Sequence, residues 1–428
     1  MPYIFRKKSI SGVHTYNLQL ITYNVIEMLT LPVYLDHNAT TPMDPLVLEA
    51  MIPYFTKKFG NPASRNHAFG WIAEEAVDLA REQVSKLIGA SDKEIIFTSG
   101  ATEADNLAIK GVFEMYREKG NHIVTYVTEH KAVIDTCKHL EKLGAEITYL
   151  AVNSDGLIDL KELESVLNER TILVSIMYAN NETGVIQPIR EISELVHRHG
   201  SLLFTDATQA VGKIPVDVNE DGIDLMAFSA HKMYGPKGVG GLYVRRKNPR
   251  VRITAQIDGG GHERGLRSGT LNVPGIVGLG KACELCRTGM EEEVRRLSYL
   301  RDKLENSLLE LEETCLNGNK EQRLPGITNI SFSHAESDGL IMAMKDIAVS
   351  SGSACTSASI EPSHVLKGMG LSDSLAHSSI RFGLGRFTNE EEIDFVIEQT
   401  QKAVKQLREG SPFWKLFKEA GKAEWQEN

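Results

Sequence analysis

The stretch "DLMAFSAHKMYGPKGVGG", residues 224–241, decides the fold. Its apolar first half, bounded by turn residues, is typical of a buried strand. Ser229, His231 and Lys232 follow, with a Gly/Pro-rich loop behind them. A lysine just past a strand end points into the crevice where open α/β sheets bind ligands. Its amine can form a Schiff base with an aldehyde cofactor. Taken alone, the motif is also consistent with a surface lysine in a glycine loop.

Strand and helix patterns alternate through the first two thirds of the chain. Further strand-like runs lie at residues 94–100, 122–128, 146–152, 171–178, 201–207 and 240–246. Helical patterns lie between several of them, including residues 73–89 and 189–200. This alternation predicts an α/β fold with a mostly parallel sheet that helices cover on both faces.

The pattern changes after residue 285. A long charged helix is predicted at residues 290–313, and a second at 388–409, where Thr388 and Glu391 are spaced as a capping box. We therefore expect an N-terminal extension at residues 1–32, a large domain at 33–285 and a smaller α+β domain at 286–428.

Composition is that of an ordinary globular protein, with 42% hydrophobic and 24% charged residues in a chain of 428. The net charge of -10 disfavours direct nucleic-acid binding, and no apolar run is long enough to span a membrane. Five cysteines suit a reducing compartment. Residues 1–27 are basic and nearly free of acids, which fits either a mitochondrial transit peptide or a disordered extension upstream of a start at Met28.

Three more strand ends carry polar residues. Asp206 and Gln209 follow one strand, His130 follows another, and Ala101 and Thr102 begin a helix after a third. Asp206 can pair with a pyridinium nitrogen, His130 can stack on a pyridine ring, and the helix start can bind a phosphate. Each residue alone also reads as a cap or turn residue. Together with Lys232 they predict a crevice for pyridoxal phosphate.

A lone thiol lies in "VSSGSACTSAS", residues 349–359, among small residues. Cys355 is either incidental or presented to a reactant. Cys283 and Cys286 form a CxxC pair without a second pair or a histidine cluster, so we expect no metal there. Cys137 and Cys315 are interpreted as structural.

The chain resembles the NifS/IscS-type cysteine desulfurases, which are fold-type I pyridoxal-phosphate enzymes of the class V aminotransferase group. The resemblance runs from Val33 to about Trp414 and is closest to the IscS branch. It rests on "YLDHNATTP", "FGNPASRNHAFG", "TSGATEADNLAIKG", "TEHKAV", "NNETG", "DATQ", "SAHKMYGPKG", "GGGHERGLRSGT", "SSGSACTSAS" and "SSIRFGLGRFT", in that order.

The resemblance implies a role for each matching residue. Lys232 is the Schiff-base lysine, Asp206 holds the pyridinium nitrogen, and Gln209 holds the ring hydroxyl. His130 stacks on the ring and assists proton transfer, and Cys355 is the nucleophile. The remaining implied contacts are Ala101, Thr102, Ser229 and His231 at the cofactor, Thr270 at the phosphate of a neighbouring subunit, and Asn181 and Arg381 at the substrate carboxylate, with Asn181 also near the cofactor.

The implied reaction converts L-cysteine to L-alanine and leaves a persulfide on Cys355. The implied partners are a second copy of the chain, an iron–sulfur cluster scaffold protein and other sulfur acceptors, including carriers for tRNA thiolation. No resident metal is implied, beyond a transient contact of Cys355 with a cluster on the scaffold. The expected location is the cytoplasm, or the mitochondrial matrix if residues 1–27 are a transit peptide.

Two departures from the family pattern stand out. Ala230 replaces the usual glycine before His-Lys, which adds a methyl beside the cofactor lysine. The tail "SPFWKLFKEAGKAEW" resembles the segment that docks the scaffold, but it is shorter than usual. Three alternatives stay open: another aminotransferase, a selenocysteine lyase, and an interaction hub with a vestigial site.

Overall fold

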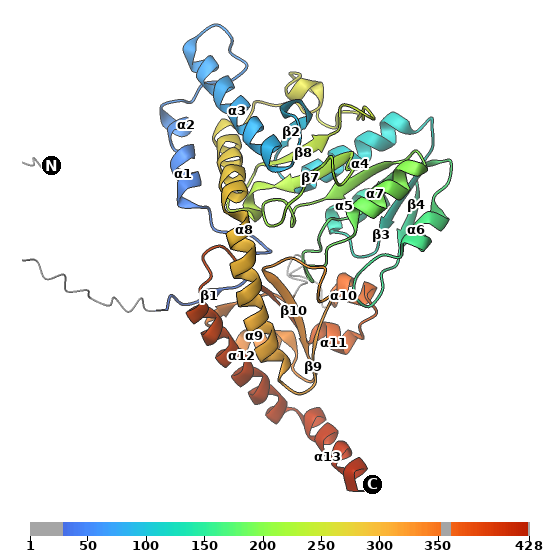
Figure 1. Ribbon diagram of the computed structural model, residues 1–428, viewed down its shortest axis with the longest axis vertical. Helices are drawn as coiled ribbons and strands as arrows, with labels where there is room; N and C mark the ends of the chain where they lie inside the picture. The colour runs from blue at the N-terminus through green and yellow to red at the C-terminus, as the bar shows by residue number, and fades with distance from the viewer. Residues whose placement is uncertain (1–28, 352–360, 427–428) are drawn as a thin grey trace, which may run out of the picture. The chain divides into compact units, whose positions relative to one another are not determined.

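A seven-stranded sheet forms the centre of the fold in the computed structural model, which describes residues 29–351 and 361–426 (Figure 1). In sheet order its strands are β2 (Ile95–Thr98), β8 (Gly240–Val244), β7 (Leu225–Ser229), β6 (Leu202–Asp206), β5 (Thr171–Ser175), β3 (His122–Tyr126) and β4 (Glu146–Leu150). β8 is antiparallel to both of its neighbours, and every other pair is parallel. The predicted α/β fold with a mostly parallel sheet is confirmed.

Helices cover both faces of this sheet. One face packs against α4 (Ala101–Tyr116) and α5 (Lys131–Glu141). The other packs against α3 (Ala68–Leu87), α6 (Leu160–Val166), α7 (Ile189–Arg198) and the first part of α8 (Val273–Leu309). The central strands β5, β6 and β7 are almost wholly buried, which explains why their sequences are continuous apolar runs.

A smaller antiparallel sheet lies in the C-terminal part of the chain. It consists of β12 (Ser379–Gly383), β10 (Ile327–Phe332) and β9 (Thr314–Leu316). α12 (Glu390–Gly410) packs against α8 and α9 (Ser337–Ala343) beside it. The short strand β1 (Val33–Tyr34) pairs in parallel with β11 (Ile347–Ala348), so the start of the predicted large domain joins the predicted small one.

The remaining elements are short, apart from the last helix. The helices are α1 (Pro45–Met51), α2 (Pro53–Thr56), α10 (His364–Gly368), α11 (Asp373–His377) and α13 (Pro412–Gln426). Three 3-10 turns are η1 (Asp92–Glu94), η2 (Ala230–Lys232) and η3 (Glu263–Gly265). No helix within the described residues is long and apolar enough to cross a membrane.

Two predicted helix boundaries need correction. The charged helix expected at 290–313 is the second half of α8, which begins at Val273 because Asn272 caps it and a proline follows at its start. α8 is continuous through residue 285, so the division into domains there stays a prediction. The capping box of α12 is formed by Asn389 and Glu392, one residue later than expected.

Candidate active site

The predicted Schiff-base lysine, Lys232, lies at the sheet edge where β7 ends. Lys232 belongs to η2, and its Nζ donates hydrogen bonds to the carbonyl oxygens of Asn38 (2.6 Å) and Ala39 (2.7 Å). The segment after β1 is held against η2, since the Thr41 N–H donates to the His231 carbonyl (2.9 Å). The amine therefore meets a loop almost two hundred residues earlier in the chain.

The extra methyl of Ala230 is accommodated by a glycine. Ala230 is fully buried beside Lys232. A Cβ built on Gly235 would lie only 2.8 Å from the Ala230 methyl. The glycine at 235 therefore leaves the space that Ala230 fills, and the departure from the family pattern disturbs no packing at the lysine.

A cavity of about 550 Å³ opens at this sheet edge. It collects most of the predicted site residues, namely Ala101, Thr102, His130, Asn181, Asp206, Gln209, Ser229, His231, Lys232 and Arg381. Thr270 is exposed on the segment before α8 and does not line this cavity. Cys355 lies outside the described residues, so its predicted role stays a prediction.

One end of the cavity is built to hold an anion. Gly100 precedes α4 with φ 155°, an angle that side chains rarely allow, and no side chain caps the helix. The first N–H groups of a helix have no partner within the helix, so they can bind an anion here. Ser229 and Lys237 also line this cavity. A phosphate fits this donor set.

His231 contributes as a neutral imidazole. Its Nδ1 lies 3.1 Å from the Thr40 hydroxyl. Burial, together with the nearby charges of Lys232 and Lys237, lowers the pKa of His231 to about 4. The ring is therefore uncharged at neutral pH, and its nitrogens can donate or accept hydrogen bonds without adding charge.

The middle of the cavity carries groups that suit a pyridine ring. Asp206 is 4% exposed, and its Oδ1 accepts a hydrogen bond from the Thr208 N–H (2.9 Å). Gln209 donates through Nε2 to the Asn38 carbonyl (3.0 Å), and its Oε1 accepts from Lys213 (2.6 Å). Both contacts fix the orientation of the Gln209 amide.

His130 is both a helix cap and a cavity residue. Its Nδ1 accepts a hydrogen bond from the Ala132 N–H (3.1 Å) at the start of α5. The neutral ring therefore carries its proton on Nε2. The cap explains why this histidine has a fixed position beside the cavity, so the simple interpretation and the functional one are compatible.

The third part of the cavity holds a buried arginine. Arg381 in β12 is 2% exposed, and its Nη2 forms an ion pair with Asp36 (2.7 Å). Its Nη1 donates to the Asn181 carbonyl (3.0 Å), while its Nε has no hydrogen-bond partner among the described residues. The guanidinium is therefore fixed by two contacts and retains a buried N–H donor. Sequence reasoning placed Arg381 and Asn181 together but did not find Asp36.

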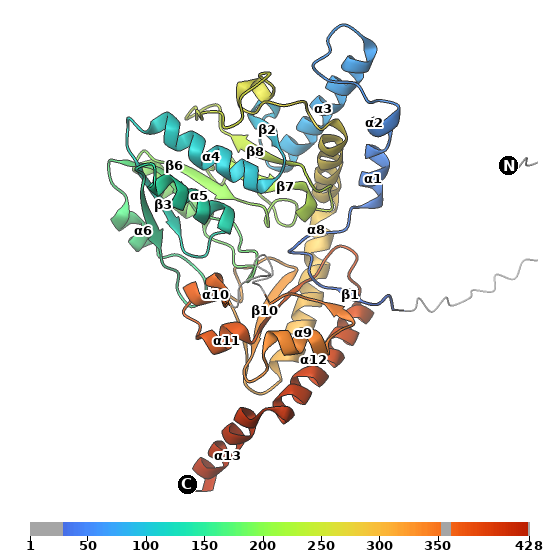
Figure 2. The same ribbon diagram turned by 180° about the vertical axis from the view of Figure 1, so that it is seen from behind.

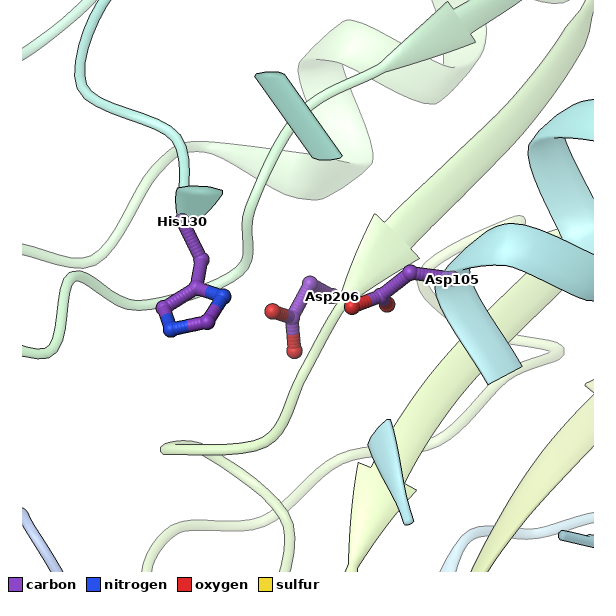
Figure 3. Close-up of side chains that lie close together, drawn as sticks. All are labelled: Asp105, His130 and Asp206. Atoms are coloured by element: carbon purple, nitrogen blue, oxygen red, sulfur yellow. The ribbon is translucent and has the colours of Figure 1, made fainter. Parts of the chain in front are cut away.

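Two further acids lie behind the cavity, and the sequence analysis missed both. Asp105 in α4 and Glu129 before α5 are completely buried. Burial and repulsion from Asp206 raise the pKa of each carboxyl. Glu129 accepts a hydrogen bond from the Met177 N–H (2.6 Å), whereas neither oxygen of Asp105 has a hydrogen-bond partner in the part of the chain that the structure describes. Figure 3 shows Asp206 between Asp105 and His130.

The other cysteines in the described part of the chain have different surroundings. Cys137, Cys283 and Cys286 are buried. Burial raises the pKa of the Cys286 thiol to about 11, and that thiol donates to the Met233 backbone carbonyl (3.9 Å). Cys315 is exposed on β9, and its interpretation as a structural cysteine stays a prediction.

Comparison with known proteins gives a consistent relationship. Residues 33–396 match the family described as Aminotransferase class-V. The chain is 59% identical over 393 residues to a protein named cysteine desulfurase IscS from Klebsiella pneumoniae, covering 91% of this chain and 97% of that protein. A protein of the same name from Escherichia coli is 58% identical over the same share of both chains.

Solved structures agree with these matches. A structure titled NifS-like protein superposes with a TM-score of 0.81 at 39% identity, covering 87% of this chain and 99% of that one. A NifS-like protein from Rickettsia africae gives 0.79 at 31% identity, covering 88% and 100%. A third structure, titled SspA in complex with cysteine, gives 0.73 at 36% identity, covering 82% and 98%.

Proposed function

This chain belongs to the class V aminotransferase family and is a cysteine desulfurase of the IscS type, and from this we propose that it uses pyridoxal phosphate to convert L-cysteine to L-alanine. The sulfur passes to Cys355 as a persulfide. The observation that carries the proposal is the cavity in which Lys232, Asp206 and His130 meet. Three strand or loop ends far apart in the sequence place an amine, a carboxylate and an imidazole around one space.

The cavity matches the cofactor from end to end. The start of α4, with Ser229 and His231, would hold the phosphate. Asp206 would hold the ring nitrogen, and the Gln209 amide would hold the ring hydroxyl. Lys232 Nζ would hold the aldehyde carbon, since it donates to two backbone carbonyls that a bound group can replace.

The residues around the substrate have equally distinct tasks. When bound, pyridoxal phosphate supplies an electron-accepting ring that stabilises negative charge on the substrate's α carbon. His130 Nε2 and Lys232 Nζ would move the proton at that carbon. The Arg381 guanidinium, fixed by Asp36, would bind the substrate carboxylate through its remaining N–H, and Asn181 would line the same side.

Sulfur transfer belongs to Cys355. Its thiolate would attack the substrate sulfur, and the bond between that sulfur and the β carbon would break. The electron pair of the broken bond stays on carbon, which takes up a proton and leaves as alanine. The sulfur stays on Cys355 as a persulfide, ready for an acceptor. We propose an iron–sulfur cluster scaffold as the main acceptor.

Replacing the nucleophile tests this proposal. Wild-type protein given pyridoxal phosphate and cysteine should form alanine and carry sulfane sulfur after desalting. Cys355→Ser should still show the absorbance change on cysteine addition, because the residues around the cofactor are intact, but it should hold no sulfane sulfur. Cys315→Ser is the matched control, since that thiol is exposed and lies on β9, away from the cavity lining. Persulfide at another cysteine in an active Cys355→Ser protein would contradict the assignment.

The rival activities give different results in the same assay. An aminotransferase would convert a keto acid to an amino acid whether or not Cys355 is present. A selenocysteine lyase would prefer selenocysteine and would turn over cysteine poorly. An interaction protein with a vestigial site would form no alanine. It would also show no cofactor absorbance band, and borohydride treatment would leave no covalent mark at Lys232.

We also propose a homodimer. α1, α2 and α3 pack beside the first part of α8 (Figure 2). Large apolar side chains that are each more than half exposed lie on these helices and on the segments between them, namely Leu46, Ile52, Phe55, Phe59, Trp71 and Leu79. Several exposed large apolar side chains on neighbouring elements are typical of an interface. A second copy would cover it, and Thr270 would then reach the phosphate end of the neighbouring cavity.

The C-terminal helix is our candidate docking segment for the scaffold. Phe413 and Leu416 of α13 are exposed, whereas Trp414 packs on the His334 ring at 5.4 Å. The exposed aromatic and aliphatic side chains suit an interface hot spot. We propose that the protein acts in the cytoplasm. The mitochondrial alternative depends on residues 1–27, which lie outside the described residues.

A further inference from the structure

We propose that Asp105 is a positioning residue that stays protonated and donates a hydrogen bond to the Asp206 carboxylate. The two carboxyl groups together then present one negative charge to the ring nitrogen of the cofactor. The proposal rests on the proposed function for the identity of that ring. It concerns an acid outside the cavity lining, which the mechanism above does not use.

The geometry brings the two carboxyl groups together from different elements. Asp105 lies near the start of α4, and Asp206 is the last residue of β6. One carboxylate oxygen of each and a ring nitrogen of His130 all lie within 4.8 Å of one another. Figure 3 shows the Asp105 carboxyl pointing towards Asp206, with His130 on the far side of Asp206.

Burial leaves Asp105 no other way to satisfy its oxygens. The residue is completely buried, and both side-chain oxygens lack a hydrogen-bond partner among the described residues. A buried ionised carboxylate without donors or a counter-ion is strongly unfavourable. If Asp105 is a neutral carboxylic acid that donates a hydrogen bond to the neighbouring carboxylate, no second charge is buried and its hydroxyl has a partner.

The charges facing Asp105 favour the neutral form. Asp206 faces it from β6, and Glu129, followed by His130, faces it from the segment between β3 and α5. Tyr126 at the end of β3 is also buried nearby, and the Asp206 and Glu129 charges help raise its pKa. Burial first, and then repulsion from Asp206 and Glu129, raises the pKa of Asp105 well above its usual range.

The local hydrogen bonds decide which acid holds the proton. Asp206 accepts the Thr208 backbone N–H, and a hydrogen bond of this kind favours the charged form of a carboxyl. Asp105 accepts none. Asp206 is therefore the carboxylate and Asp105 the acid. The donated hydrogen bond would fix the Asp206 carboxylate with its remaining oxygen lone pairs directed at the cavity.

Two substitutions separate this role from the alternatives. Asp105→Asn keeps a neutral donor of the same shape, and Asp105→Leu keeps the volume but removes the donor. We expect the dissociation constant of pyridoxal phosphate from the apoprotein to rise roughly ten- to hundredfold in Asp105→Leu, as the loss of a hydrogen bond to a charged group predicts. Asp105→Asn should stay within about threefold of wild type, as the smaller change between two neutral donors implies. Equal losses in both variants would overturn the proposal, because they would mean that the anion is required.

The pH dependence of stability gives a readout that needs no cofactor. A raised pKa means that folded apoprotein keeps a proton that the unfolded chain releases above about pH 4. Wild-type stability should therefore fall as the pH rises above that value, and Asp105→Asn should lack this loss. The melting temperature of Asp105→Asn minus that of wild type should increase from pH 5 to pH 8. Asp135→Asn is the matched control, because Asp135 is exposed and its substitution should leave the difference in melting temperature from wild type nearly independent of pH.

If the melting temperature of Asp105→Asn minus that of wild type stays constant with pH, the proposal is overturned. Calorimetry with Mg²⁺ and Zn²⁺ adds a second check. If wild-type protein binds either metal and Asp105→Asn does not, then Asp105, His130 and Asp206 form a cation site, and the proposal is also overturned. If wild-type protein forms no alanine from cysteine, the proposed function fails, yet the melting experiment still decides whether Asp105 holds a proton.

Discussion

At the scale of single residues, Lys232 gives the most direct prediction. Lys232→Ala should abolish alanine formation from cysteine. Lys213, whose amine is close enough to Lys232 to feel its charge, donates to the Gln209 oxygen at 2.6 Å. Lys237→Ala is the control, since it lines the same cavity from the following loop and should reduce cofactor affinity without abolishing turnover. Alanine release by Lys232→Ala at more than a few per cent of the wild-type rate would count against the assignment.

Asp206 carries a second prediction at this scale. Asp206→Asn should leave the cofactor bound but slow removal of the substrate's α proton, because a neutral amide cannot keep the ring nitrogen protonated. Loss of one hydrogen bond between charged groups predicts roughly a ten- to hundredfold slower turnover. The rate of alanine formation and the isotope effect with α-deuterated cysteine measure it. An unchanged rate would make Asp206 a turn residue only.

The site residues predicted from the strand and helix pattern lie at strand ends or helix starts, whereas Arg381 lies within β12 and was predicted only from the family resemblance. Lys232, Asp206 and His130 could be found because a parallel sheet brings such ends to one edge. Asp36 and Asp105 could not be found this way. Asp36 reaches Arg381 across 345 positions, and Asp105 is one acid in a helix whose burial only the packed structure reveals.

At the scale of elements, strand positions were predictable and helix limits less so. Apolar runs bounded by turn residues gave β5, β6 and β7 nearly complete. Two neighbouring residues could cap α12, because Thr388 with Glu391 has the same capping-box spacing as Asn389 with Glu392. The backbone resolves the choice, because the Thr388 hydroxyl accepts the Gly385 N–H and the Asn389 side chain is free to cap.

α13 gives a prediction at the same scale. Truncation after Pro412 should leave desulfuration of free cysteine nearly intact and weaken sulfur transfer to the scaffold. The helix lies at the C-terminal end of the described chain and packs against α12 (Figure 1). Pull-down of the scaffold and persulfide transfer to it measure the effect.

A double variant sharpens the truncation experiment. Phe413→Ala with Leu416→Ala removes the exposed apolar side chains and leaves the Trp414 packing on His334 in place. It should weaken scaffold binding as much as truncation does. Trp414→Ala is the control for lost packing. Equal scaffold binding before and after truncation would remove α13 from the interface.

At the scale of the whole molecule, the seven-stranded sheet is what turns scattered motifs into one cavity. β2, β3, β6 and β7 end near a common edge, and the segment after β1 closes it from the C-terminal part of the fold. The order of strands cannot be read from a single sequence, because alternation of strands and helices allows several orders. The antiparallel β8, inserted between β2 and β7, is the clearest example.

Thr270 supplies the prediction that depends on two molecules. It is exposed and does not line its own cavity, and we propose that it completes the phosphate site of a second copy. Thr270→Asp should therefore repel a phosphate across the dimer interface and lower the affinity for pyridoxal phosphate. Mixed dimers identify whose cavity is affected.

The decisive mixture pairs Lys232→Ala with Thr270→Asp. In that heterodimer, the Thr270→Asp subunit keeps its own Lys232 and receives an intact Thr270 from its partner, so one complete site forms. Activity should rise to about half that of wild type per dimer, although each parent homodimer is weak. The control pairs wild type with the Lys232→Ala, Thr270→Asp double variant, in which the only intact lysine faces an aspartate from its partner. Restoration in the control instead of the test mixture would place Thr270 in its own subunit's site.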